Sequence, residues 1–156
     1  MTNKGFTLIE LIVTIVVLGI LAVTAAPKFM NIQGDARKAT LSGVEGALKS
    51  SVGIVYGKAA LNGAEKGQAF VEVNNKNIAV IDGTPVASKA NLDHIVQTDI
   101  HTFNGITNGQ TGPHVVVFGF QKTATAVYES QCYLQATNIS NNSETIFVTT
   151  IFSDGC

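Results

Sequence analysis

The chain is organised around its N-terminal stretch, Lys4-Gly5-Phe6-Thr7-Leu8-Ile9-Glu10, followed by LIVTIVVLGILAVTAA at residues 11–26. From Phe6 to Ala26 the residues are almost all apolar. As a helix they would extend about 30 Å, which is the thickness of the hydrocarbon core of a bilayer. The sequence therefore predicts a membrane-spanning helix over this stretch.

Glu10 is the one ionisable residue in the apolar stretch. A carboxylate in lipid costs about 2 to 3 kcal/mol unless it reaches the interface or finds a partner. An acidic side chain in the first turns of a helix also suits the helix macrodipole, and lipid headgroups lie close by. Glu10 alone therefore does not decide between a functional charge and a helix-end preference.

The arrangement around Glu10 is more specific. Lys4-Gly5 followed by Phe-Thr-Leu-Ile-Glu and a long apolar run resembles the class III signal of type IV prepilins. The resemblance implies that a prepilin peptidase cuts between Gly5 and Phe6 on the cytoplasmic side and then methylates the new amine of Phe6. It also implies that Glu10 neutralises the N-terminal amine of a neighbouring subunit in a filament. Such an ion pair is tolerable in an apolar bundle, where either charge alone is costly.

An ordinary secretory signal is the alternative reading of the same residues. Lys4 would be its positive end and Val23-Thr24-Ala25 its small-residue cleavage site, which would leave a secreted soluble binding protein. Glu10 counts against this alternative because it interrupts the apolar region close to its start. The apolar run is also longer than most signal cores.

Composition fits one globular domain joined to one membrane segment. The chain has 156 residues, of which 46% are hydrophobic and 13% charged. We expect a leader at residues 1–5, a transmembrane or filament-core helix at 6–27 and a globular domain at 28–156. The formal net charge is -1, so we expect no nucleic-acid partner.

The two cysteines, Cys132 and Cys156, lie in the last part of the chain. An even pair in an exported chain usually forms one disulfide, and two free buried thiols are the alternative. A disulfide would close a C-terminal loop of about 24 residues, worth roughly 3 kcal/mol in the chain-entropy model. The pair has no CxxC spacing and no neighbouring His, so a zinc or redox site is not indicated.

Gly19 and Pro27 are the weak points of the long apolar helix, and we expect a kink near Ala26. In type IV pilins, the segment between a glycine and a proline at these positions can lose its helix in the filament. The resemblance therefore implies a flexible segment here. A gently bent, continuous helix in the isolated subunit is the alternative.

A second, amphipathic pattern extends from Lys28 to Tyr56 and predicts a helix that packs on a sheet. Its apolar face comprises Leu41, Val44, Leu48, Val52 and Val55. Glu45 and Lys49 form an i,i+4 pair on the charged face. We expect Gly57, Asn62 and Gly63 to end this helix.

The remaining sequence predicts an antiparallel sheet. A looser region extends to about Pro113. In it we expect a hairpin of residues 70–73 and 78–81, followed by a turn at 82–85 and a short helix at 90–96 capped by Asn91. Further turns are predicted at Asn104-Gly105 and Asn108-Gly109. The strongest strand patterns are residues 115–120, 126–128, 133–136 and 145–152, joined by polar connections that include 121–123 and 138–143. With one long helix on this sheet, the predicted fold class is α+β.

No catalytic, cofactor or metal site is indicated by the sequence. His94, His101 and His114 follow no metal-ligand spacing, and surface or turn histidines are the simpler interpretation. The sequence also lacks a nucleophile elbow, an HExxH motif and a phosphate-binding glycine loop. We therefore expect a non-enzymatic protein without a cofactor.

A narrower resemblance comes from LGILAVTAAPKF at residues 18–29, DARKATL at 35–41 and GAL at 46–48. These segments resemble the mannose-sensitive haemagglutinin class of type IVa pilins, and the cysteine pair that ends at the last residue agrees with it. Pseudopilins of type II secretion and minor pilins share the N-terminal motif and are the alternatives. The major pseudopilins lack the cysteine-bounded C-terminal loop.

The resemblance implies a structural subunit of an adhesive surface fibre. Such a subunit is held in the inner membrane before assembly and then polymerises with copies of itself outside a Gram-negative cell. The implied partners are the prepilin peptidase, an assembly platform and an assembly ATPase, and the surface receptor is unknown.

Overall fold

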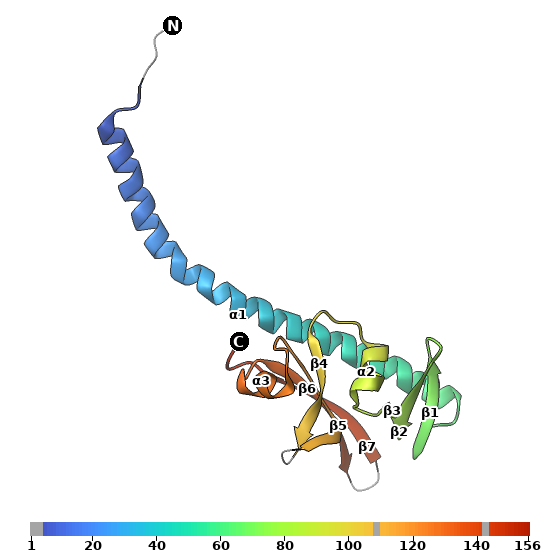
Figure 1. Cartoon of the computed structure of the whole chain (residues 1–156). Helices are drawn as coiled ribbons and strands as arrows, with labels where there is room; N and C mark the ends of the chain where they lie inside the picture. Colours follow the sequence, from blue (N-terminus) through green and yellow to red (C-terminus); the bar gives the residue numbers. More distant parts are fainter. Residues whose placement is uncertain (1–4, 108–109, 142–143) are drawn as a thin grey trace. The chain divides into compact units, whose positions relative to one another are not determined.

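The computed structural model describes residues 5–107, 110–141 and 144–156. The elements follow the order α1 (Leu8–Leu61), β1 (Gln68–Val73), β2 (Lys76–Ile81), β3 (Thr84–Pro85), α2 (Lys89–Ile95), β4 (His101–Thr107), β5 (Gln110–Gly119), α3 (Ala124–Glu129), β6 (Tyr133–Asn141) and β7 (Glu144–Phe152) (Figure 1). The chain divides into two compact units, residues 1–36 and 37–156, and α1 contributes to both. The predicted turn at Asn108-Gly109 and the first four leader residues lie outside the described residues.

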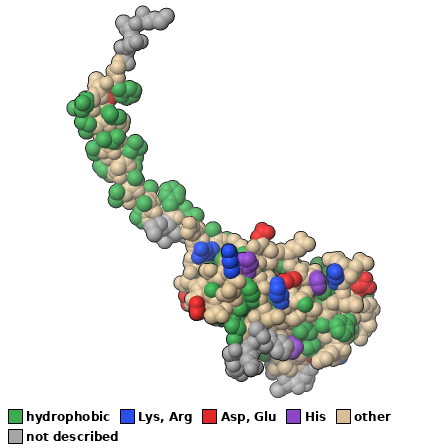
Figure 2. Space-filling view, viewed as in Figure 1, with side chains coloured by type: hydrophobic (Ala, Val, Ile, Leu, Met, Phe, Trp, Pro, Cys, Tyr) green, Lys and Arg blue, Asp and Glu red, His purple; other side chains and the backbone are tan. Residues whose placement is uncertain are grey.

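From Leu11 to Ala26, helix α1 is apolar on every side. Its large hydrophobic side chains are exposed, and no residue of the most hydrophobic 18-residue window of α1 is buried. Figure 2 shows these hydrophobic side chains along the helix. By length and composition this helix could cross a membrane. A helix of this kind needs lipid or other apolar helices around it.

Helix α1 continues through Pro27, although the proline nitrogen has no hydrogen to donate. The helix therefore extends without interruption from the apolar stretch into the amphipathic stretch. The kink near Ala26 stays a prediction.

The C-terminal end of α1 is a Schellman motif. Gly63 has a φ of 67°, its backbone N–H donates to the carbonyl of Ala60, and the N–H of Ala64 donates to the carbonyl of Ala59. Glycine is suited to this left-handed position because it has no Cβ. Asn62 and Gly63 thus end the helix as predicted, whereas Gly57 lies inside it.

Two antiparallel sheets follow the helix, where the sequence predicts one. The first has the order β1-β2-β3, and it contains the predicted hairpin with Asn74 and Asn75 at its turn. These two asparagines have φ values of 51° and 60°, as a type I′ turn requires. The predicted turn at 82–85 is confirmed at Asp82-Gly83, after which Thr84 and Pro85 form β3.

The second sheet has the order β4-β5-β6-β7, each strand antiparallel to its neighbour. Several sequence predictions for this region are wrong. Asn104-Gly105 is not a turn but lies in β4, at a register irregularity between Asn104 and Ile106. The loose region predicted to extend to Pro113 contains β4 and the start of β5, and residues 138–141 belong to β6 rather than to a connection.

Residues 126–128 form part of helix α3, so the strand predicted there is wrong. Thr123 caps this helix, because its side chain accepts a hydrogen bond from the backbone N–H of Ala126. Val127 is buried in the helical conformation. From the same helix, the Tyr128 hydroxyl oxygen accepts from the backbone N–H of Ile106, and the Tyr128 ring contacts the ring of Tyr133. The cap and the tertiary contacts override the strand preference of Val and Tyr.

The short helix predicted at 90–96 is present as α2, but Ser88 caps it instead of Asn91. Asn91 is buried, and its side-chain amide donates to the carbonyls of Ala79 and Val86. Asn91 therefore joins α2 to the first sheet.

The amphipathic face of α1 packs on both sheets. Leu41, Val44 and Leu48 lie in one buried cluster with residues that include Val116, Phe118 and Leu134. Val55 and Ala59 lie in a second cluster with Val71, Val73, Ile78 and Val80. Val52 is only half-buried. The α+β class is confirmed: a long N-terminal helix packs against C-terminal antiparallel sheets.

Candidate functional site

The N-terminal motif begins outside the helix. Residues 5–7 precede α1, and the bond between Gly5 and Phe6 is therefore in non-helical backbone. Phe6 is 84% exposed, and no heavy atom lies within 4 Å of a Cβ built on Gly5. Among the described residues, none packs on the predicted cleavage point.

Thr7 and Glu10 form a capping box at the start of α1. The Thr7 hydroxyl oxygen accepts from the backbone N–H of Glu10 at 3.3 Å, and Glu10 Oε2 accepts from the Thr7 backbone N–H at 3.3 Å and from its hydroxyl at 3.1 Å. The carboxylate of Glu10 is thus held at the N-terminal end of the helix, one turn from Phe6. The sequence signal for this box is Thr-x-x-Glu at residues 7–10, and the sequence prediction missed the role of Thr7.

The threonines inside the apolar part of α1 are satisfied by the helix itself. The Thr14 hydroxyl donates to the carbonyls of Glu10 and Leu11 at 2.9 and 2.8 Å, and the Thr24 hydroxyl donates to the carbonyl of Leu21 at 3.0 Å. These bonds need no water, which suits an apolar environment. Gly19 lies in the same part of α1, and no heavy atom lies within 4 Å of a Cβ built on Gly19.

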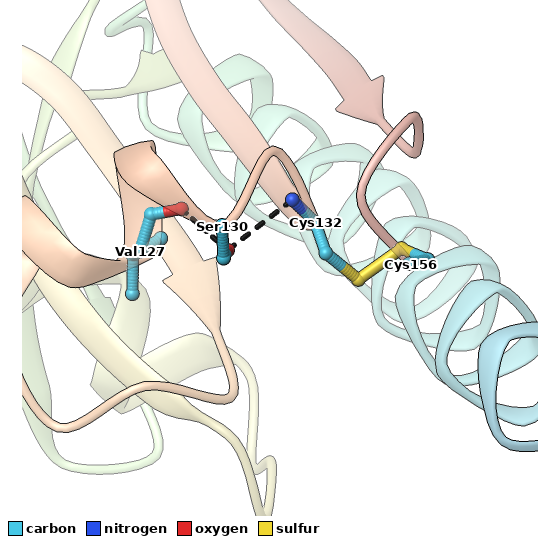
Figure 3. The surroundings of a disulfide bond; sticks show 4 residues. All are labelled: Val127, Ser130, Cys132 and Cys156. Atoms are coloured by element: carbon cyan, nitrogen blue, oxygen red, sulfur yellow. Dashed lines mark hydrogen bonds between the residues drawn. A yellow bond between two sulfur atoms is a disulfide. The ribbon is translucent and has the colours of Figure 1, made fainter.

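Cys132 and Cys156 form the predicted disulfide, with their Cα atoms 4.8 Å apart. Cys132 is buried in the core cluster that also contains Leu48. Ser130 supports the bridge from the α3–β6 connection, because its hydroxyl donates to the Val127 carbonyl at 2.7 Å and accepts from the Cys132 N–H at 3.3 Å (Figure 3).

The C-terminal end is held by backbone contacts as well. The N–H of Gly155 donates to the carbonyl of Gln131 at 3.0 Å. A Cβ built on Gly155 would lie 1.9 Å from the carbonyl oxygen of Ser130, so only glycine fits here. The bridge and this close approach together fix the C-terminal segment against the start of β6.

Glu45 links α1 to β7. Its Oε1 lies 2.8 Å from Lys49 Nζ, the i,i+4 pair that the sequence predicts, and it accepts from the Thr149 hydroxyl at 2.7 Å. The hydrogen bond from Lys49, followed by that from Thr149, lowers the pKa of Glu45. The contact to Thr149 spans 104 positions and has no signal in the sequence.

Asp82 links the two sheets. Its carboxylate accepts from the backbone N–H groups of Gly67 at 2.9 Å and Thr145 at 2.8 Å. These two bonds lower the pKa of Asp82. Lys66 forms an ion pair with Glu144 at 3.1 Å beside this junction.

The three histidines lie apart from one another. His94 is in α2, His101 begins β4, and His114 is in β5 with a φ of 76°. Among residues 5–107, 110–141 and 144–156, no group of three or more His, Cys, Asp or Glu side chains could hold a metal ion.

Comparison with known proteins gives one family model and three related proteins. Residues 1–26 match the model of the prokaryotic N-terminal methylation motif. The type IV narrow pilus major component PilA5 of Thermus thermophilus is 41% identical over 54 residues, which are 35% of this chain and 47% of PilA5. The chain therefore spans about half the length of this relative.

Two type IV major fimbrial proteins FimA from Dichelobacter nodosus are also similar. One is 25% identical over 124 residues, covering 79% of this chain and 75% of that protein. The other is 30% identical over 81 residues, covering 52% and 48%. No solved structure matches. None of these three relatives bears the name of the mannose-sensitive haemagglutinin class, which stays a prediction.

Proposed function

We propose that this chain, whose residues 1–26 match the prokaryotic N-terminal methylation motif, is a type IV pilin and a major structural subunit of a surface pilus. One observation carries the proposal. The methylation motif ends in an all-round apolar helix whose first turn holds the Glu10 carboxylate through Thr7. This arrangement suits a helix that leaves lipid for a bundle of its own copies. The role is structural and non-enzymatic.

Processing is the first proposed step. Prepilin peptidase would remove residues 1–5 by cutting between Gly5 and Phe6, and would methylate the amine of Phe6. The exposed, non-helical backbone at this bond supports the proposal, since a protease needs extended substrate. Gly5→Leu should leave the leader attached, which the mass of the cellular subunit reports. Efficient cleavage of this variant would count against the proposed role of Gly5.

Assembly is the second proposed step, and it uses Glu10. In the apolar core of a fibre, the carboxylate of one subunit would neutralise the Phe6 amine of a neighbour. Either charge alone is costly in such a medium. The two hydrogen bonds from Thr7 both go to one carboxylate oxygen of Glu10, Oε2. The apolar helix at 6–27 would then exchange lipid for neighbouring helices without long exposure to water.

The globular domain at 28–156 would lie outside the inner membrane before assembly and on the fibre surface afterwards. The Cys132–Cys156 disulfide supports this placement, because such bonds persist in oxidising compartments. The segment from Gly19 to Pro27 would supply flexibility to the fibre. Adhesion and membership of the mannose-sensitive haemagglutinin class are part of the proposal. Its partners are copies of the chain, prepilin peptidase, and the assembly platform and ATPase.

Replacement of Glu10 separates assembly from folding. Glu10→Ala should give a processed, membrane-held subunit and no surface fibres, as seen by electron microscopy. Glu129→Ala is the matched control, since Glu129 is exposed at the end of α3 in the globular domain. Abundant normal fibres from the Glu10 variant would refute the docking role.

A further inference from the structure

A polar groove lies on the globular domain between α2, β4 and the connection after β5. It is open to solvent and has a volume of about 570 Å³, and its lining includes Lys89, Asp93, Gln97, His101, Phe103 and Lys122. Figure 2 shows basic, His and acidic side chains interspersed on the face that carries α2 and β4 in Figure 1. A volume of this size accommodates a small organic ligand or a few sugar rings.

The groove carries a positive excess on a chain whose formal net charge is -1. Lys89 and Lys122 contribute two positive charges and Asp93 one negative charge, which leaves +1 among these lining residues. Lys89 Nζ lies 2.6 Å from Asp93 Oδ2, so this pair is mutually neutralised. Lys122 is exposed and forms no ion pair with another residue in the described part of the chain.

The same groove offers an aromatic surface and neutral polar groups. The rings of His101 and Phe103 have centroids 6.2 Å apart, and both residues line the groove. The exposed amide of Gln97 and the carboxylate of Asp93 can exchange hydrogen bonds with hydroxyl groups. Pyranose rings combine an apolar C–H face with a hydroxyl edge, which matches these two kinds of surface.

Hydrogen bonds tie the walls of the groove to neighbouring elements. The backbone N–H of Lys89 donates to Asn104 Oδ1 at 2.9 Å, which ties α2 to β4. The Ser51 hydroxyl donates to the carbonyl of Ile95 at 2.9 Å, which ties the end of α2 to α1. A preformed site loses little free energy to ordering when a ligand binds.

We propose that this groove binds an acidic saccharide, with Lys122 opposite the sugar carboxylate and the His101–Phe103 pair against a ring face. One unpaired lysine is too little charge for nucleic acid, which is held by many cationic contacts. The aromatic pair and the hydroxyl-binding groups would be superfluous for a simple inorganic anion. This inference rests on the proposed function, because a subunit of a surface fibre would meet saccharides outside the cell.

Binding can be measured on single chains, so it does not depend on fibre assembly. The full chain is kept in a non-ionic detergent and titrated calorimetrically with trigalacturonic acid, with maltotriose as the neutral trisaccharide. Trigalacturonic acid should bind at least about tenfold more tightly than maltotriose, a difference of about 1.4 kcal/mol. Lys122→Glu should weaken binding about tenfold, and His101→Ala should weaken it without changing the formal charge.

Lys76→Glu is the matched control, because Lys76 is exposed at the start of β2 and does not line the groove. It changes the net charge by the same amount and should leave the affinity within about twofold. The proposal is overturned if trigalacturonic acid does not bind, or if Lys76→Glu weakens binding as much as Lys122→Glu does. Equal binding of maltotriose, or complete displacement by an equal concentration of inorganic phosphate, would also overturn it.

Discussion

Loss of the disulfide in Cys156→Ser should destabilise the globular domain substantially. The bridge joins residues 24 positions apart, and the chain-entropy model assigns a loop of this size roughly 3 kcal/mol. Cys132 is only 2% exposed, so its freed thiol stays in the core and adds little by itself. With about 4 °C of melting temperature per kcal/mol for a domain of this size, the expected loss is roughly 12 °C.

Near-ultraviolet circular dichroism reports this transition, because Tyr133, next to Cys132 in the chain, contacts the rings of both Tyr128 and Phe152. The full chain is melted in a non-ionic detergent with and without dithiothreitol. The wild-type chain under reducing conditions should melt close to the Cys156→Ser variant, and the variant should not respond to the reductant. Identical melting of wild type and variant under oxidising conditions would refute the stabilising role of the bridge.

Three further substitutions test contacts within the globular domain. Asp82→Asn should lower the melting temperature at neutral pH; because the folded-state pKa of Asp82 is lowered, its stabilisation is present above about pH 4 and is lost as the pH falls below that value. Gly155→Ala should cost about 1 to 3 kcal/mol, since the new Cβ overlaps the carbonyl oxygen of Ser130. Tyr128→Phe should cost about 1 to 2 kcal/mol, because the Ile106 N–H loses its acceptor at 3.1 Å.

Each of these variants has a control elsewhere in the chain. Asp99→Asn changes an exposed carboxylate and should lower the melting temperature less than Asp82→Asn does. Gly46→Ala places a methyl group where no heavy atom lies within 4 Å, and in a helix it should stabilise by up to about 1 kcal/mol. Tyr56→Phe removes a hydroxyl from a side chain that is 47% exposed. Equal melting of a variant and its control would contradict the contact assigned to that variant.

The long helix and the class of the fold could be predicted from the sequence because their signals are local. The apolar run after Phe6 and the three-four spacing of Leu41, Val44 and Leu48 each identify a helix face within a few turns. The Asn-rich segment between β1 and β2 identifies a hairpin in the same way. Thr7 could have been found from its Thr-x-x-Glu pattern.

The errors have non-local or competing causes. Val127 and Tyr128 favour a strand by composition, but Thr123 caps a helix there and Val127 fills the space beside Gly119. Gly105 resembles a turn glycine, yet its missing side chain makes room for Val115 of the neighbouring strand. The contact between Asp82 and Thr145 spans 63 positions and follows only from the folded arrangement.

The central claim is that residues 1–5 are removed and that Phe6 becomes the methylated first residue of a fibre subunit. Mass spectrometry of the N-terminal peptide from surface fibres sheared off intact cells tests it most directly. The account predicts a peptide that begins with N-methylated Phe6 and contains Glu10. Fibres without this chain, or a subunit that begins at Met1 or Ala26, would contradict the account.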